Sequence, residues 1–261
     1  MQKLTAEDIG DERLTAWSSL HGVRAICEFI VVYGHTYFLI LLFVTDPHTY
    51  EKEFDNVWGR LKFSATSIVQ VFFFISGFFL IYFLQIYAET RQVSWRSIPK
   101  IIFHRWWRLS PSIAFVVAIV ATWFRHLGSG PLWKFFVTNL TSAQCRQYFW
   151  AHVFLYNNYL PDDIACSYQT WYVAADMQLH ILGLIIHFMI RHRTLRFKLI
   201  TLSILLLIGT AGPILHVWLQ DLDAFLMQTP EVYRTLYDDT FRKYHTYGHN
   251  NTSCLILGMG T

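Results

Sequence analysis

Long stretches without a charged residue limit what this chain can fold into. The longest, 63–88, contains no Asp, Glu, Lys or Arg, and the stretches 109–124 and 199–220 contain none either. A helix of about 20 apolar residues crosses a bilayer, whereas buried helices of soluble domains contain shorter apolar runs. The sequence therefore predicts an integral membrane protein.

Two further apolar stretches each contain one acidic residue, Glu28 in 25–45 and Asp176 in 164–190. With 54% hydrophobic and 15% charged residues, the composition also differs from that of soluble domains, in which about a quarter of residues are charged. We expect an all-α polytopic transmembrane helix bundle that follows a cytoplasmic segment, 1–19. The predicted spans are 22–45, 66–88, 99–124, 168–190 and 199–219, with a possible sixth beginning at 252–261.

The charges in the connections predict the orientation. The connections 89–100 and 191–198 have an excess of Lys and Arg, which favours the cytoplasm. The N-terminus would then be cytoplasmic, in the plasma membrane or the endoplasmic reticulum. The opposite side would hold 45–62, 125–163 and 220–249, and the glycosylation sequons of that side start at Asn139, Asn250 and Asn251. The net charge of +3 is spread along the chain, so no nucleic-acid partner is expected.

Two cysteines, Cys145 and Cys166, fall in the third connection. On the non-cytoplasmic side they favour a disulfide, with two free thiols as the alternative. The segment from Gln147 to Pro161 is apolar but too short to span, and it predicts an interfacial helix.

Ionisable side chains inside predicted spans are costly and suggest functional sites. At 100° per residue, Arg24, Glu28 and His35 share one face of the first helix, and His35 lies about 16 Å further along the axis than Arg24. Arg24 and Glu28 could form an ion pair one turn apart. His35 could make a structural hydrogen bond, or it could act as a general base.

The fourth predicted helix has a second polar face, formed by Asp176, His180 and His187. We expect this face to meet that of the first helix, with Asp176 either as a counter-ion or as the group that orients a histidine. At the start of the third helix, Arg105 and Arg108 lie one turn apart. They could bind a phosphate, or they could anchor the helix at the interface beside tryptophans.

Three other candidates favour structural roles. Ser76 and Gly77 lie among bulky aromatic residues, which is typical of a close helix contact, and no base is spaced to activate Ser76 as a nucleophile. His245 and His249 are four residues apart, but without acidic or cysteine neighbours they are interpreted as solvated loop histidines. We expect no metal and no permanently bound cofactor.

Several motifs occur together in a characteristic order. They are Leu20-His-Gly-Val-Arg-Ala, Arg24-x10-His35, Phe74-Ile-Ser-Gly-Phe, Arg105-x-x-Arg108-x-x-Pro111 and Trp171-Tyr-Val-Ala-Ala-Asp-Met-Gln. Their order and spacing resemble the membrane acyltransferase 3 family. The form Cys-x4-Trp-Tyr-x3-Asp-Met-Gln, from Cys166 to Gln178, is similar to the animal branch called nose resistant to fluoxetine.

This resemblance implies a bundle of about ten helices that transfers an acyl group from acyl-coenzyme A to a hydroxyl of a lipid or small-molecule acceptor. It assigns His35 as general base, Arg24 as its partner and Asp176 as a third catalytic residue. Arg105 and Arg108 would bind coenzyme A phosphates. The expected partners are membrane lipids, acyl-coenzyme A and an unidentified hydroxyl acceptor.

The chain is expected to be a fragment that covers about the first half of such a bundle. Two alternatives to acyl transfer remain open: a carrier of lipophilic molecules, and an inactive truncated remnant.

Overall fold

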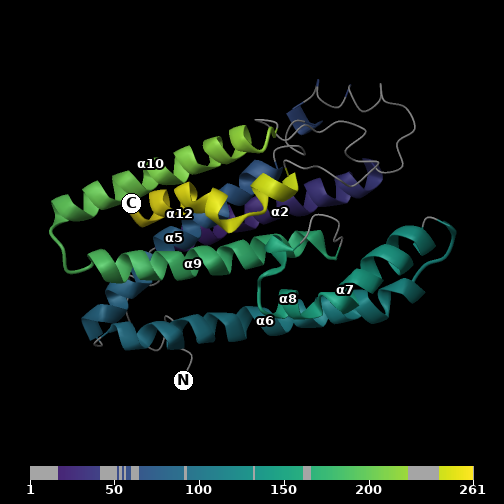
Figure 1. The fold of residues 1–261 in the computed structure, drawn as a ribbon, viewed down its shortest axis with the longest axis horizontal. Coiled ribbons are helices and arrows are strands. Elements are labelled where there is room, and N and C mark those ends of the chain that lie inside the picture. The colour runs from purple at the N-terminus through teal and green to yellow at the C-terminus, as the bar shows by residue number, and fades with distance from the viewer. Residues whose placement is uncertain are drawn as a thin grey trace.

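A computed structural model of the chain describes residues 17–41, 52, 55, 57–59, 65–90, 93–131, 133–160, 166–222 and 241–260. Throughout these ranges the regular secondary structure is helical, so the predicted all-α class is confirmed. Long helices lie alongside one another (Figure 1). They are α2 (Ser18–Leu41), α5 (Ala65–Thr90), α6 (Ile98–Thr122), α9 (Trp171–Ile190) and α10 (Leu195–Leu219).

Four helical segments in the described residues are long and apolar enough to cross a membrane: Ser67–Glu89, Trp95–His126, Trp171–Ile190 and Leu195–Leu219. They coincide with four of the five predicted spans. The first predicted span coincides with α2, which is not among these four. At the possible sixth span the structure has a short helix, α12 (Thr252–Gly260). The predicted cytoplasmic segment 1–19 lies mostly outside the described residues.

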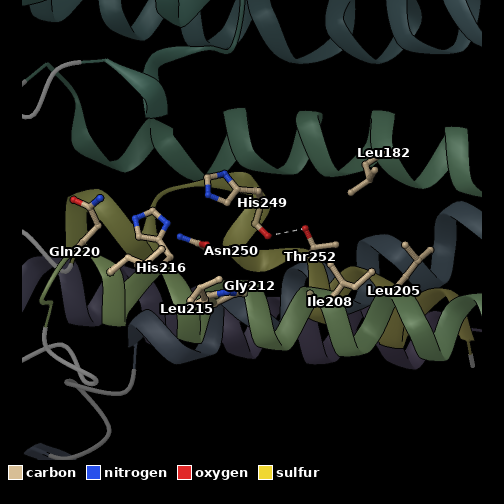
Figure 2. A pocket seen from close by; sticks show the side chains of 13 residues that line it. Leu182, Leu205, Ile208, Gly212, Leu215, His216, Gln220, His249, Asn250 and Thr252 are labelled. Carbon is tan, nitrogen blue, oxygen red and sulfur yellow. Dashed lines mark hydrogen bonds between the residues drawn. The ribbon is translucent and has the colours of Figure 1, made fainter.

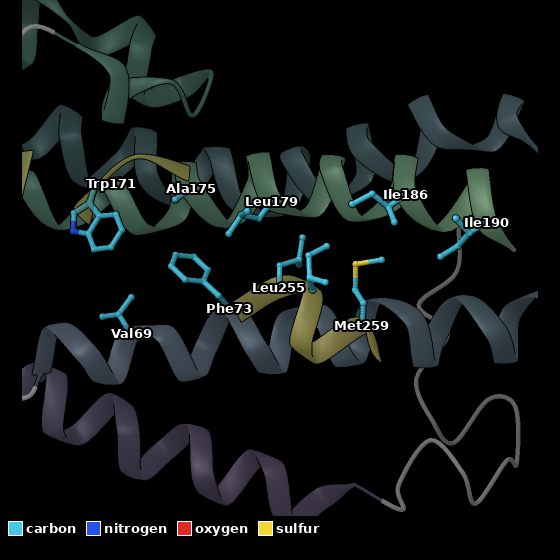
Figure 3. Close-up of a cluster of buried hydrophobic side chains, with 10 residues drawn as sticks. Val69, Phe73, Trp171, Ala175, Leu179, Ile186, Ile190, Leu255 and Met259 are labelled. Carbon is cyan, nitrogen blue, oxygen red and sulfur yellow. The ribbon is translucent and has the colours of Figure 1, made fainter. Parts of the chain in front are cut away.

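Helix α5 packs against α2, α9 and α12. Glycines bring α5 and α12 close together, because a Cβ at Gly77 would meet the carbonyl of Leu255, and one at Gly258 would meet that of Phe74. The predicted helix contact at Gly77 is therefore present. Buried apolar side chains of α5, α9 and α12 form the adjoining core (Figure 3), which contains Val69, Phe73, Trp171, Ala175, Leu179, Ile186, Ile190, Leu255, Ile256 and Met259.

The two basic connections lie together at one end of the bundle. Arg191 donates a hydrogen bond from Nη1 to the carbonyl of Val93 over 2.5 Å, and its guanidinium lies 4.5 Å from the ring centroid of Phe188. Trp95 packs against the same phenylalanine. The connections that share an excess of positive charge are thus neighbours in the fold.

The opposite end is covered by short helices rather than by one interfacial helix. Between Gln147 and Pro161 the chain forms α8 (Phe149–Val153) and η5 (Asn157–Tyr159), which are separated by a backbone turn at Leu155 with a φ of 55°. The predicted continuous helix is therefore wrong. The segment packs into the bundle instead, because Trp106 and Ser110 of α6 both donate hydrogen bonds to the carbonyl of Val153.

A disulfide joins Cys145 to Cys166 at this end, and both residues are buried. Cys145 belongs to the short helix α7 (Ala143–Gln147) and packs against Val117 and Ala121 of α6. The cross-link therefore ties the segment before α9 to the end of α6.

The sequons near α12 are part of the packed structure. Asn250 and Asn251 are 8% and 2% exposed. Asn251 donates to the carbonyls of His245 and Tyr247, and it accepts a hydrogen bond from Gln70 of α5. A glycan could not be accommodated on these amides in the folded chain, so we now expect Asn250 and Asn251 to remain without glycans, contrary to the sequence-based expectation. The side chain of Asn139 lies outside the described residues.

Candidate active site

A buried ion pair connects three helices at the centre of the candidate site. Arg105 of α6 donates from Nη2 to Oδ2 of Asp176 on α9 over 2.5 Å. Ser76 of α5 donates to Oδ1 of the same carboxylate over 2.8 Å, and its hydroxyl lies 3.4 Å from Nη2 of Arg105. The side chains of Arg105 and Asp176 are 19% and 11% exposed. Asp176 therefore serves as a counter-ion, one of the two predicted roles.

The sequence places these groups on inward-facing helix surfaces. Asp176, His180 and Gly183 are buried on one face of α9, as their spacing predicts. Gly183 allows Leu80 of α5 to approach, because a Cβ at this glycine would meet that side chain. Ser76 lies in the middle of α5 beside Gly77, and the close helix packing there brings its hydroxyl to the carboxylate.

Arg24 brings a second guanidinium to this region. It lies 5.1 Å from the ring centroid of Phe79, one turn along α5 from Ser76. Tyr172 and Asp176 of α9 act on Arg24 electrostatically, as do the charges of Arg105 and Arg108. We call Arg24, Arg105, Arg108 and Asp176 the guanidinium cluster. Its three cations exceed its single anion, so the cluster has a net positive charge of two.

The i, i+4 ion pair between Arg24 and Glu28 is absent from the part of the chain that the structure describes. Glu28 is exposed, and Arg24 turns instead towards Phe79. Arg108 is exposed, whereas Arg105 is held by Asp176. Of the two predicted phosphate ligands, Arg108 is therefore the one whose donors are open to a ligand.

His35 lies apart from the guanidinium cluster. Eleven residues separate it from Arg24, which corresponds to about 16 Å along the axis of α2. Its Nδ1 lies 2.8 Å from the carbonyl of Val31, and its side chain is exposed. The two polar faces meet only in part: Arg24 of α2 interacts electrostatically with Asp176 of α9, although α5 packs against both helices. The structure brings Arg24, Arg105, Arg108 and Asp176 together and leaves His35 outside that group.

His180 is a residue that the resemblance did not assign. It is 7% exposed, and neither ring nitrogen has a hydrogen-bond partner in the described residues. Arg105, Arg108 and Asp176 all act on it electrostatically. A buried imidazole without a partner is unusual, since buried polar groups are nearly always paired. Its signal in the sequence was its position one turn after Asp176.

A separate cavity of about 570 Å³ lies between α9, α10 and η8 (Gly248–Asn251) (Figure 2). At one end the rings of His216 and His249 stack with centroids 5.9 Å apart, and Tyr159 and His249 share a hydrogen bond of 3.1 Å. Burial, followed by the nearby His216, lowers the pKa of His249. No motif marked His216, which the sequence shows only as one histidine near the end of an apolar run.

The prediction that His245 and His249 are solvated loop histidines is also wrong. The ring of His245 packs edge-on against Trp171 with centroids 5.0 Å apart, and burial lowers its pKa to about 4. His249, although exposed, stacks on Tyr159. Both histidines therefore belong to the packed end of the bundle that lies opposite the basic connections.

An apolar helical bundle whose helices bring together the guanidinium cluster defines the class as a polytopic membrane protein with a charged site. The acyltransferase domain model, that of the acyltransferase 3 family, matches residues 17–235, so the chain belongs to this family of membrane acyltransferases.

The chain is similar to Nose resistant to fluoxetine protein 6 of Caenorhabditis elegans, with 27% identity over 63% of this chain and 21% of that protein. It therefore spans about a fifth of the length of this relative. No solved structure matches the chain.

Proposed function

We propose that this chain forms part of an integral membrane O-acyltransferase that moves an acyl group from acyl-coenzyme A to a hydroxyl of a lipid or small-molecule acceptor. The observation that carries the proposal is the environment of His35. A carbonyl oxygen can only accept a hydrogen bond, so the contact with Val31 assigns the proton to Nδ1. The Nε2 atom then has a free lone pair on an exposed ring and is suited to act as a base.

The guanidinium cluster supplies the donor site in this proposal. Coenzyme A is a polyanion, and the net positive charge of two, with Arg108 exposed, suits its phosphates. Between the phosphates and the thioester of coenzyme A lies the extended pantetheine arm. The roughly 16 Å along α2 from Arg24 to His35 is a distance that this arm can bridge.

The reaction follows from this arrangement. Nε2 of His35 takes the proton of the acceptor hydroxyl, and the oxygen attacks the thioester carbonyl. When the tetrahedral intermediate collapses, the carbon–sulfur bond breaks and the ester forms. The coenzyme A thiolate leaves with the proton that His35 had accepted. Asp176 is a positioning residue here, because it orients Arg105 and does not reach His35.

The orientation belongs to the same proposal. The basic connections around Val93 and Arg191 lie at one end of the bundle, and positive charge favours the cytoplasmic side. Acyl-coenzyme A is found in the cytoplasm, so the N-terminal ends of α2 and α6, where the cluster arginines lie, would face the donor. We propose a cytoplasmic N-terminus in the plasma membrane or the endoplasmic reticulum.

The test compares two neighbouring substitutions in the full-length protein in membranes supplied with labelled acyl-coenzyme A. His35→Ala should lower transfer of the label by about 100-fold or more, the usual contribution of a general base. Thr36→Ala is the matched control, because Thr36 is also exposed and makes the same kind of contact, with the carbonyl of Val32. Full transfer by His35→Ala would overturn the assignment of the base.

A further inference from the structure

The cavity between α9 and α10 lies apart from the residues used in the proposed reaction. Its volume of about 570 Å³ falls within the range of small-molecule sites, which are mostly apolar with a few polar groups. Gly212 of α10 lines it, and a Cβ built there would meet no atom within 4 Å. The glycine therefore leaves space in the cavity that packing does not use.

The lining changes character along the helix axis. Leu182, Leu205 and Ile208 line the part towards the middle of the bundle, whereas His216, Gln220 and His249 gather at the other part (Figure 2). His216 and Leu205 are eleven residues apart on α10, about 16 Å along the axis. The polar part lies at the end of α10 away from the basic connections. The cavity thus has the polarity gradient of an amphiphile in one leaflet.

The polar part is uncharged and has free hydrogen-bonding capacity. None of the lining residues is Asp, Glu, Lys or Arg. The ring of His216 has no hydrogen-bond partner within the described ranges, and it stacks on His249, whose Nδ1 is engaged with Tyr159. Two imidazoles with open nitrogens can accept a hydrogen bond from a hydroxyl group and can donate one to its oxygen. An ionic headgroup would find no counter-charge here.

We propose that this cavity binds a neutral single-chain lipid that bears a hydroxyl headgroup, of the monoacylglycerol or long-chain alcohol type. The hydroxyl contacts His216 and His249, and the chain runs along α10 past Gly212 towards Leu205. This site does not depend on the proposed acyl transfer, since it contains none of the residues of the guanidinium cluster and does not include His35.

The test uses the full-length protein in phosphatidylcholine nanodiscs with a photoactivatable, diazirine-bearing monoacylglycerol. Irradiation and peptide mapping should show saturable labelling within 195–219 that unlabelled monoacylglycerol competes away. Gly212→Leu fills the cavity and should weaken this labelling by about tenfold. Leucine also has a higher helix propensity than glycine, so α10 should fold. The control is Thr210→Leu on the exposed face of the same helix, which should label like the wild type.

The polar part is tested separately with His216→Phe. This substitution should lower labelling by the monoacylglycerol probe and leave labelling by a diazirine-bearing hydrocarbon unchanged. Equal labelling of the wild type and Gly212→Leu, or label that is not competed away, would overturn the site. The site is also overturned if 195–219 takes no label because another helix of the full-length protein covers the cavity. If His216→Phe affects both probes equally, the hydroxyl assignment is wrong.

Discussion

Arg105 of α6 and Asp176 of α9 form an ion pair of 2.5 Å, and Ser76 of α5 completes the hydrogen bonding of the carboxylate. The interaction fixes three helices relative to one another through residues that are far apart in sequence. Removing one charge of a buried pair is far more harmful than replacing both, because it leaves the other charge uncompensated.

We therefore expect Asp176→Ala to lower the free energy of unfolding by about 3 kcal/mol or more. The double substitution Arg105→Met with Asp176→Leu should recover most of this loss. Arg108→Met, at an exposed position, should change the free energy of unfolding by less than about 0.5 kcal/mol. Unfolding of the purified full-length protein in detergent measures all three. If the double variant is less stable than Asp176→Ala, the ion pair does not have the role assigned to it.

Arg108 provides the clearest test of donor binding. Arg108→Gln should raise the KM for acyl-coenzyme A by about tenfold, the loss of one charge-assisted hydrogen bond, with kcat nearly unchanged. Arg96→Gln is the control, because Arg96 is also exposed and lies in η2 (Trp95–Ser97), just before α6. Steady-state kinetics with the full-length enzyme decide the matter. The same change in KM for both variants would indicate a general surface-charge effect and no specific phosphate contact.

The pattern of glycosylation tests whether the packed sequons at Asn250 and Asn251 stay unmodified. We expect Asn139→Gln to abolish a glycan-dependent shift in electrophoretic mobility, and Asn250→Gln to leave the shift intact. Asn251→Ala should instead lower thermal stability, since it removes the hydrogen bonds to His245, Tyr247 and Gln70. Endoglycosidase treatment of each variant provides the measurement. A glycan on Asn250 or Asn251 would contradict the packing of η8 against α5 and α9.

His152 should make the end of the bundle that holds the disulfide sensitive to acid. It is 1% exposed, its Nδ1 is bonded to Thr170, and burial lowers its pKa to about 4. As the pH falls, the unfolded chain binds a proton at this residue before the folded chain does. The stabilisation is therefore complete above pH 6.5 and is lost between about pH 6.5 and 4, by roughly 3 kcal/mol in total.

Melting temperatures of the full-length protein across this pH range test the assignment. His152→Gln keeps a hydrogen-bonding side chain and removes the titration, so its stability should fall less steeply with acid. Equal slopes for the wild type and the variant would show that other groups cause the acid sensitivity.

The sequence alone predicted the helices well. Exposing a long apolar run to water is costly, so such runs favour the bilayer, and within the bilayer the backbone must form helices. It also predicted the polar face of α9, since Asp176 and His180 are buried and His187 is half-buried, as their helical spacing suggests. Which helices meet was not predictable from one sequence. The close approach of α5 and α12, for example, depends on glycine contacts such as Gly77 with Leu255, whose partners lie far apart in the chain.

In the candidate site, too, local features were predictable and tertiary contacts were not. Residue types predicted that Arg24, Arg105, Arg108 and Asp176 are functional or paired, but the pairing of Arg105 with Asp176 is a tertiary contact. Local patterns likewise could not show that the segment after Gln147 breaks at Leu155 and folds into the bundle. Its burial comes from hydrogen bonds that α6 donates to Val153.

The stoichiometry of coenzyme A release tests the central claim most directly. Full-length protein in membranes is given labelled acyl-coenzyme A, and free coenzyme A thiol and acylated product are measured together over time. Acyl transfer with His35 as base predicts one thiol released for each acylated hydroxyl, and loss of both in His35→Ala. Movement of a labelled lipid between membranes without thiol release would contradict the account and would favour a carrier of lipophilic molecules.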